Sequence, residues 1–219
     1  SRRSQIQNAK FLRIGGAIPY SEARKEIINF LDRGERDFSY LETVQAKFRS
    51  FGDGEANPDK KVRYMQNAKA IEAFTKLMQA KKFPGITFSR ETSRPQFDIN
   101  GLTINVPIAL RLEKQNGKFG GSVCIFVSSD GSRMSLKARI NHLTNLVYWC
   151  LSETNSQPNL ELDPGLCRVF DVFGHDVAKA SGKLSALVKL AGNSAKEIVE
   201  LWDSIEPPSD YDGPEWMQP

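Results

Sequence analysis

The chain has 219 residues, of which 40% are hydrophobic and 26% charged, and its formal net charge is +4. This composition is that of an ordinary globular protein and excludes collagen-like, mucin-like and wholly disordered classes. No apolar run approaches the roughly 20 residues that span a bilayer, so we expect no membrane partner. The polar N-terminus is not followed by an apolar segment, so we expect no secretory signal.

The three cysteines, Cys124, Cys150 and Cys167, each lie among apolar residues. Their odd number and the lack of CxxC spacing favour neither a disulfide framework nor a zinc site. We therefore expect reduced, buried thiols in a cytoplasmic protein. The chain has two histidines, His142 and His175, and no nucleophile-elbow, HExxH or dinucleotide motif. We expect no catalytic residue, no metal site and no cofactor.

The first 83 residues predict three helices. Ser21 precedes an apolar stripe of helical spacing, which Gly34 is expected to end. A loop rich in Gly, Asn and Pro covers residues 53–59. Beyond it a third stripe is clearest from about Asn67 and closes at Phe83.

The middle one of these helices begins at a capping-box sequence. Ser39 and Glu42 have the required spacing, so we expect the Ser39 hydroxyl to accept a hydrogen bond from the backbone N–H of Glu42. The stripe that follows includes Phe51, which is therefore expected to face the core. Gly52 is expected to end the helix.

From Ile86 the apolar residues recur at every second position, which predicts strands. Asn100 and Gly101 form the strongest hairpin signal in the chain. Pro107 lacks an N–H and indicates an edge or a bulge in the strand after this turn. Six alternating apolar residues predict that strand as one half-buried element: Leu102, Ile104, Val106, Ile108, Leu110 and Leu112.

The second half of the chain predicts further elements of both kinds. Residues 123–127 alternate as a strand, residues 135–153 carry a clean amphipathic helical stripe, and residues 166–173 form a dense β-type run. Two helices, 183–191 and 194–205, are expected to be separated by Gly192.

These elements predict an α+β fold in which a helical N-terminal part packs with a mixed β-sheet and C-terminal helices. We expect a basic helical region at 1–85, a sheet domain at 86–205 and an acidic tail rich in proline and aromatic residues at 206–219. The core order is α-β-β-β-α-β.

This order, across roughly residues 66–173, resembles the core of the PD-(D/E)XK nuclease fold. The resemblance implies a divalent metal held by acidic side chains and a lysine near the attacking water. The family places an Asp on one strand and (D/E)-x-K on the next. Asp98 is available, but residues 123–127 hold no acid or lysine, and Glu113 and Lys114 lack the intervening residue. If the resemblance extends to the site, these three side chains would take the place of the family's residues; the favoured interpretation is that they are solvated charges at strand ends.

Charge is distributed unevenly along the chain. Residues 1–90 hold 18 Lys/Arg and 10 Asp/Glu, whereas residues 91–219 hold 12 and 16, so the two parts carry +8 and −4. A basic surface attracts phosphate backbones or an acidic protein. The candidate nucleic-acid-binding residues are Arg2, Arg3, Lys10, Arg13, Lys60, Lys61, Arg63, Lys69 and Lys76.

The tail, residues 206–219, combines four prolines and four acids with Tyr211, Trp216 and Met217. Large apolar side chains are costly to expose. We therefore expect these three to bind a partner protein or the protein's own surface.

Together these patterns predict a non-catalytic binding or complex-subunit protein that engages nucleic acid or an acidic protein partner through its basic N-terminal half. Two alternatives remain open, an atypical metal-dependent nuclease and a pure assembly protein that acts through its tail.

Overall fold

The computed structural model describes residues 2–10, 20–34, 37–126, 133–155 and 159–208. The chain forms two compact units. The terminal unit holds residues 1–18, 97–104 and 185–219, and the sheet unit holds residues 19–96 and 105–184. The domain ranges expected from the sequence, 1–85, 86–205 and 206–219, stay a prediction.

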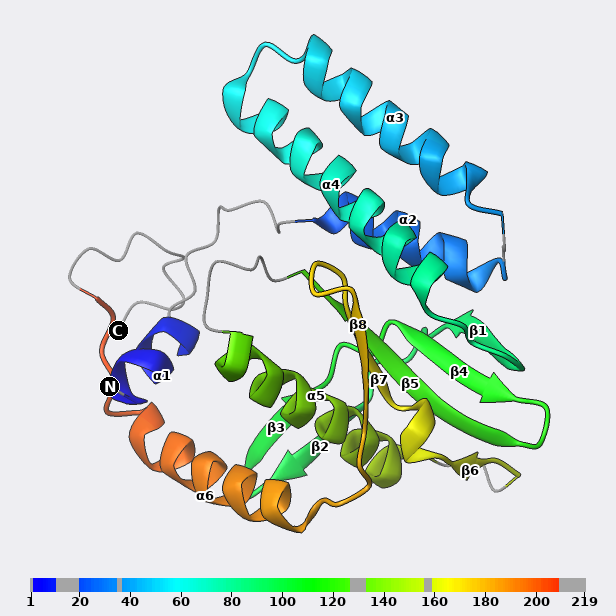
Figure 1. Cartoon of the computed structure of the whole chain (residues 1–219). Coiled ribbons are helices and arrows are strands. Elements are labelled where there is room, and N and C mark those ends of the chain that lie inside the picture. Colours follow the sequence, from blue (N-terminus) through cyan, green and yellow to red (C-terminus); the bar gives the residue numbers. More distant parts are fainter. Residues whose placement is uncertain (1, 11–19, 35–36, 127–132, 156–158, 209–219) are drawn as a thin grey trace. The chain divides into compact units, whose positions relative to one another are not determined.

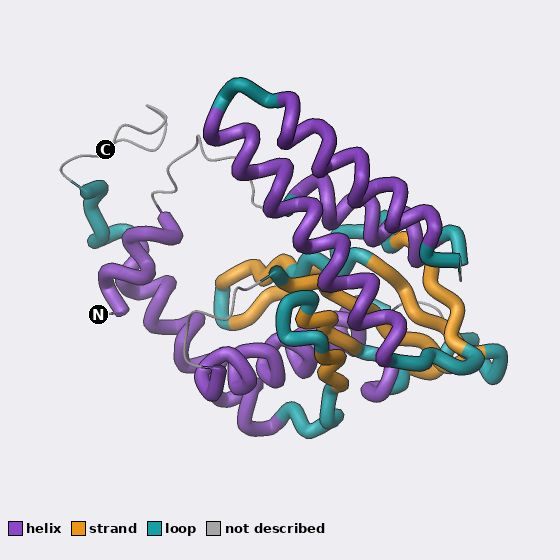
Figure 2. The backbone as a smooth tube through the Cα atoms, turned by 45° about the horizontal axis from the view of Figure 1, so that its top comes forward, coloured by secondary structure: helices purple, strands orange, loops and turns teal. Residues whose placement is uncertain are grey.

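Three helices form the N-terminal part of the sheet unit: α2 (Ser21–Asp32), α3 (Ser39–Gly54) and α4 (Pro58–Ala80). α3 and α4 lie side by side as an antiparallel hairpin that extends past the sheet (Figures 1 and 2). α4 begins well before the expected start because Asn57 caps it, accepting hydrogen bonds from the backbone N–H groups of Asp59 and Lys60. Pro58, at the first helical position, has the backbone angle that a helix requires.

The expected capping box at the start of α3 is wrong. The Ser39 hydroxyl donates to the carboxylate of Asp37 at 2.7 Å, and the N–H of Glu42 bonds the carbonyl of Phe38 at 3.0 Å. The Asp37 carboxylate also accepts the Ser39 N–H, so a side chain two residues before Ser39 binds the first backbone N–H of the helix. The helix runs past Gly52 to Gly54.

A mixed sheet forms the centre of the sheet unit. β1 pairs antiparallel with β4, and β4 with β5, whereas β5 and β7 run parallel, and β7 pairs antiparallel with β8. A short strand, β6, also pairs parallel with β5. This mixed sheet and its helices confirm the α+β class. The strands are β1 (Ile86–Arg90), β4 (Leu110–Lys114), β5 (Lys118–Ile125), β6 (Glu161–Leu162), β7 (Arg168–Asp171) and β8 (Asp176–Lys179).

Helices cover both faces of this sheet. Cys124 and Phe170, which are paired neighbours on β5 and β7, belong to the apolar core shared with α2 and α4. Successive residues of a strand point to opposite faces. A Cβ at Gly121 of β5 would meet the side chain of Leu151, so helix α5 (Arg133–Thr154) packs on the other face.

The β-hairpin at Asn100–Gly101 is confirmed. β2 (Gln96–Ile99) and β3 (Leu102–Asn105) form a separate two-stranded sheet, and Asn100 and Gly101 have φ angles of 48° and 84°, as a type I′ turn requires. The expected single strand through Leu112 is wrong, because the chain leaves the strand conformation around Pro107. There the N–H of Ile108 bonds the carbonyl of Val106 at 2.7 Å, and β4 then begins in the main sheet.

Once this hairpin and the two-residue strand β6 are set aside, the elements of the sheet unit from α4 to β7 follow the expected order α-β-β-β-α-β. They are α4, β1, β4, β5, α5 and β7. A short 3₁₀ turn, η1 (Pro164–Leu166), precedes β7 and takes up the start of the expected strand. None of the described helices is both long and apolar enough to cross a membrane.

In the terminal unit, the two C-terminal helices expected from the sequence are one helix, α6 (Ser185–Trp202). Gly192 lies inside it and does not break it. A Cβ at this position would come within 3.4 Å of the Asn100 amide nitrogen, which donates to the Gly192 carbonyl. The lack of a side chain at Gly192 therefore allows α6 to lie close to the hairpin turn at Asn100. Its cost in the helix is about 1 kcal/mol relative to alanine.

Asn67 joins α2 to α4 and is fully buried. Its carbonyl oxygen accepts the backbone N–H of Ala23 at 2.8 Å, and its amide nitrogen donates to the Glu22 carboxylate at 3.1 Å and to the Arg63 carbonyl at 2.9 Å. Burial raises the pKa of Glu22. The opposing effects are larger in sum. The Glu22 carboxylate accepts hydrogen bonds from its own backbone N–H, from Ser21 and from Asn67, and it lies near the positive charge of Arg63, so its pKa is below the usual value.

We predict that Gly120→Ala destabilises the protein. A Cβ at Gly120 would lie 2.4 Å from the backbone carbonyl carbon of Leu166, which cannot move without displacing η1. Overpacking of this kind should lower the free energy of unfolding by about 3 kcal/mol in urea titrations. The matched control is Gly54→Ala, because nothing lies within 4 Å of its added Cβ; it should change stability by less than about 1 kcal/mol. Equal effects would contradict the close approach.

We also predict that Asn67→Ala lowers the free energy of unfolding by about 3 kcal/mol, because the buried N–H of Ala23 loses its acceptor. Asn57→Ala removes an exposed cap from the same helix and should cost about 1 kcal/mol. Thermal and urea unfolding measure both. A cost at Asn67 no larger than that at Asn57 would show that the buried amide does not hold α2 in place.

Candidate functional site

The structure divides the predicted basic residues between the two units. Arg2, Arg3 and Lys10 lie on α1 (Arg2–Lys10) in the terminal unit. The residues from Lys60 to Lys76 lie on α4 in the sheet unit. Arg13, the side chain of Arg2 and the predicted partner-binding residues Tyr211, Trp216 and Met217 lie outside the described residues.

The cations of α1 bind the C-terminal end of α6. Lys10 donates to the carbonyls of Trp202 and Ile205 at 2.6 and 3.1 Å, and Arg3 donates to the carbonyl of Ser204 at 3.0 Å. The last carbonyls of a helix have no partner within it, and its C-terminal end attracts positive charge. Part of the basic N-terminal segment therefore has a structural role.

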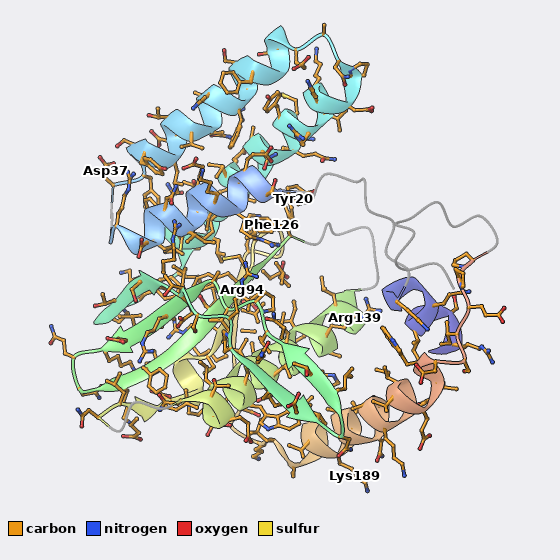
Figure 3. The ribbon with its side chains drawn as sticks, turned by 180° about the vertical axis from the view of Figure 1, so that it is seen from behind. Tyr20, Asp37, Arg94, Phe126, Arg139 and Lys189 are labelled. Carbon is orange, nitrogen blue, oxygen red and sulfur yellow. The ribbon has the colours of Figure 1, made fainter. Side chains whose placement is uncertain are left out.

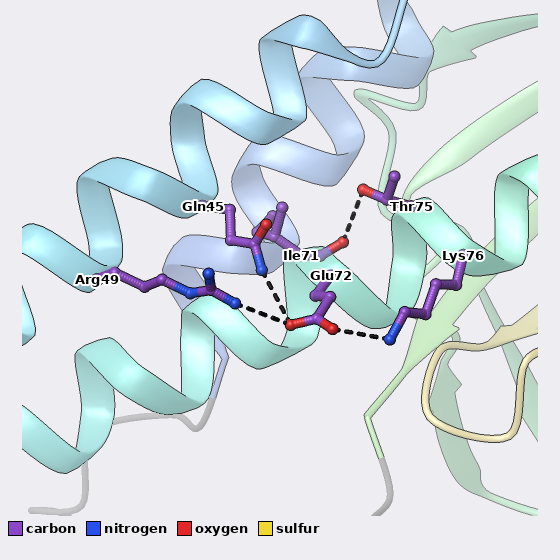
Figure 4. Close-up of polar contacts among 6 residues, drawn as sticks. All are labelled: Gln45, Arg49, Ile71, Glu72, Thr75 and Lys76. Carbon is purple, nitrogen blue, oxygen red and sulfur yellow. Dashed lines mark hydrogen bonds and ion pairs between the residues drawn. The ribbon is translucent and has the colours of Figure 1, made fainter.

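Lys76, on the outer face of α4, belongs to an ionic cluster centred on Glu72 (Figure 4). Its ammonium lies 2.7 Å from one oxygen of Glu72, and Arg49 and Gln45 of α3 donate to the other oxygen at 3.0 Å each. The hydrogen bond from Lys76 is the main cause that lowers the pKa of Glu72. The cluster ties α3 to α4 and neutralises part of that face.

Three lysines of α4, Lys60, Lys61 and Lys69, are exposed, and their ammonium groups have no hydrogen bond or ion pair within the described part of the chain. Arg63 is partly engaged, since its guanidinium lies 3.4 Å from the Glu22 carboxylate. Lys60, Lys61 and Arg63 lie in the first turns of α4, at the end of the hairpin that extends past the sheet.

Aromatic rings lie between these cations. Phe51 of α3 contacts Tyr64 of α4 edge to face, with ring centroids 5.5 Å apart. The Lys47 ammonium lies 5.5 Å from the Phe51 ring and the Arg63 guanidinium 5.8 Å from the Tyr64 ring. Lys60 and Lys61 are one helical turn from Tyr64 and share its surface. We call this set the tip patch: Lys47, Phe51, Lys60, Lys61, Arg63 and Tyr64.

The sequence interpretation missed Lys47 and Tyr64 and placed Phe51 wrongly. Phe51 continues the apolar stripe of α3, yet it is 46% exposed. At this end of the hairpin α3 packs on the first turns of α4, and no other described helix or strand covers the ring. One sequence signal could have indicated this exposed ring. Phe51 lies next to the loop rich in Gly, Asn and Pro, and Lys47 lies one helical turn before it.

Asp98, Glu113 and Lys114, the three residues considered for a nuclease site, each interact with a different partner. Asp98 belongs to the terminal unit and accepts a hydrogen bond from Thr103 at 2.6 Å. Glu113 pairs with Arg111 at 2.5 Å, and Lys114 lies 3.6 Å from Asp163, both in the sheet unit. The described residues contain no group of three His, Cys, Asp or Glu placed to hold a metal ion.

A second aromatic group lies where the parallel strands β5 and β7 end. Tyr20 stacks on Phe126 at 5.4 Å and meets Phe173 edge to face at the same distance, and Arg24 lies 5.3 Å from the Phe126 ring (Figure 3). These rings are half-buried and pack against the core of the sheet unit. Sequence analysis did not assign them to a site.

The three cysteines are free and buried, which confirms that part of the interpretation. Burial raises the pKa of Cys124 and Cys167 to about 12 and that of Cys150 to about 11. These thiols are therefore protonated at neutral pH and are poor nucleophiles.

Comparisons with known proteins return nothing to set beside this geometry: no protein-family model, no curated protein and no solved structure matches the chain. The α+β class and the candidate site are therefore defined by the structure of this chain alone.

The cysteine pKa values predict how stability depends on pH. The folded protein keeps three thiol protons that the unfolded chain releases above about pH 9, so the free energy of unfolding should fall as the pH rises from 9 towards 12. Urea titrations at several pH values measure this fall. Cys124→Ala should remove part of it, whereas an unchanged slope would contradict the burial of this thiol.

Proposed function

We propose that this protein binds nucleic acid without catalysis and that the tip patch is its contact surface, with single strands as the preferred ligand. The observation that carries the proposal is the exposed ring of Phe51, which lies against Tyr64 and is flanked by lysines that have no polar partner.

The chemistry of single-stranded nucleic acid matches this arrangement. An exposed ring offers a stacking surface to any base, while lysine and arginine contact the phosphates. An acidic protein would need the cations but would gain less from the ring. The match therefore favours nucleic acid over an acidic protein partner.

The local charge sets the strength of binding. Residues 47–64 hold five Lys/Arg and three Asp/Glu, a net charge of +2. This modest field supports weak, micromolar binding without strong sequence preference. Two observations support binding without catalysis: burial raises the pKa of the thiols, and Glu113 and Lys114 each lie in an ion pair.

We predict that the double variant Lys60→Glu and Lys61→Glu loses binding to a single-stranded oligonucleotide by at least tenfold in fluorescence anisotropy. If the four cations of the patch contact four phosphates, wild-type affinity should fall about 50-fold between 50 and 200 mM salt, and the variant should show a shallower slope. Phe51→Ala should weaken single-strand binding about fivefold or more and leave double-strand binding unchanged.

The matched control is Lys179→Glu with Lys183→Glu. It makes the same change of charge at two exposed lysines of the sheet unit that lie outside the tip patch. If both double variants lose affinity equally, the effect is one of net charge and the tip patch is not the contact surface. If wild-type protein shows no shift with either form of nucleic acid at 50 mM salt, the proposed function fails.

A further inference from the structure

An aromatic groove of about 600 Å³ lies within the sheet unit, away from the tip patch. The end of α2, the C-terminal end of α4 and strand β1 form it. Phe30 and Leu31, which are buried, contribute to its lining, together with the half-buried side chains of Phe38, Met78, Phe83 and Phe88. Its volume falls in the range of about 300–1,000 Å³ that is typical of small-molecule sites.

Neighbouring rings hold the walls of the groove in place. Phe30 stacks on Phe38 at 5.7 Å, and Phe83 meets Phe88 edge to face at 5.7 Å. Behind Phe83 lies the guanidinium of Arg168, 5.2 Å from its ring and buried. The walls are therefore ordered before a ligand arrives, which reduces the entropy cost of binding.

Three polar side chains also line the groove, Lys82, Gln115 and Thr87. None of these side chains has a hydrogen bond or ion pair to another described residue, and none of the described lining residues is acidic. The groove thus combines apolar walls with one ammonium, one amide and one hydroxyl whose donors are not used within the described part of the protein. This combination is complementary to an apolar molecule that ends in a single negative charge with two acceptor oxygens.

We propose that this groove binds a small free carboxylic acid with an apolar tail. The tail lies against the phenylalanine rings and Met78, and the carboxylate pairs with the ammonium of Lys82.

Octanoate is the probe for this site, and the methionine methyl groups report on it. In protein labelled with ¹³C at the methionine methyls, octanoate should shift the Met78 resonance and leave Met65 unchanged. Both residues lie on α4, thirteen positions apart, which corresponds to about 20 Å along the helix. Affinity should rise about tenfold from hexanoate to octanoate, because two more methylenes are buried.

The carboxylate is tested with matched compounds and variants. Octanol has the same tail without the charge and should bind more weakly than octanoate. Lys82→Met keeps an apolar stem and should weaken octanoate binding about two- to fivefold, the effect of a single exposed ion pair, without affecting octanol. Lys179→Met, outside the groove, should change neither affinity.

Three results would overturn the proposal: no shift of Met78, equal shifts of Met65 and Met78, or equal affinities for octanoate and octanol. A peptide of residues 206–219 that shifts Met78 where octanoate does not would likewise overturn it and assign the groove to an acidic, aromatic segment. The nucleic-acid titrations are independent, so either proposal can fail while the other stands.

Discussion

The side chain of Asn67 fixes the position of α2, and much of the sheet unit depends on it. A fully buried amide has to satisfy its polar atoms within the protein, and Asn67 does so with Ala23, Glu22 and Arg63. These bonds set α2 against α4, and α2 then supplies Phe30 and Leu31 to the sheet core and to the aromatic groove. The bond to the carbonyl of Arg63 lies within α4, the helix that supplies Lys60, Lys61, Arg63 and Tyr64 to the tip patch.

Local patterns in the sequence were sufficient for most of the fold. The apolar stripes of α2, α3 and α5 predict these helices because each helix buries one face, and Asn100–Gly101 predicts its hairpin because few residues adopt its backbone angles. The errors arise where a distant contact changes the meaning of a residue. Gly192 was predicted to break the helix, but it lies inside α6 and allows the contact with Asn100. The alternating pattern of residues 102–112 is continuous across Pro107, although the residues before and after this proline belong to two different sheets.

The candidate site was less accessible from the sequence. Lys60 and Lys61 could be predicted as exposed cations because they follow a cap and precede the buried stretch of α4. Nothing local distinguishes Lys10, whose ammonium binds carbonyls 192 and 195 residues later in the chain. Phe51 was assigned to the core because periodicity does not reveal where the supporting layer ends. Burial depends on the neighbouring elements, and a single sequence does not place them.

The contact of α1 with the end of α6 has a consequence for biosynthesis. The ribosome releases the chain from its N-terminus, so Arg3 and Lys10 emerge long before Trp202, Ser204 and Ile205, whose carbonyls they bind. Residues 19–96 and 105–184 are complete earlier and can form their sheet during translation. The terminal unit cannot form until α6 has left the ribosome. Until then α1 lacks the carbonyls that Arg3 and Lys10 bind, which leaves this helix accessible to chaperones and proteases during synthesis.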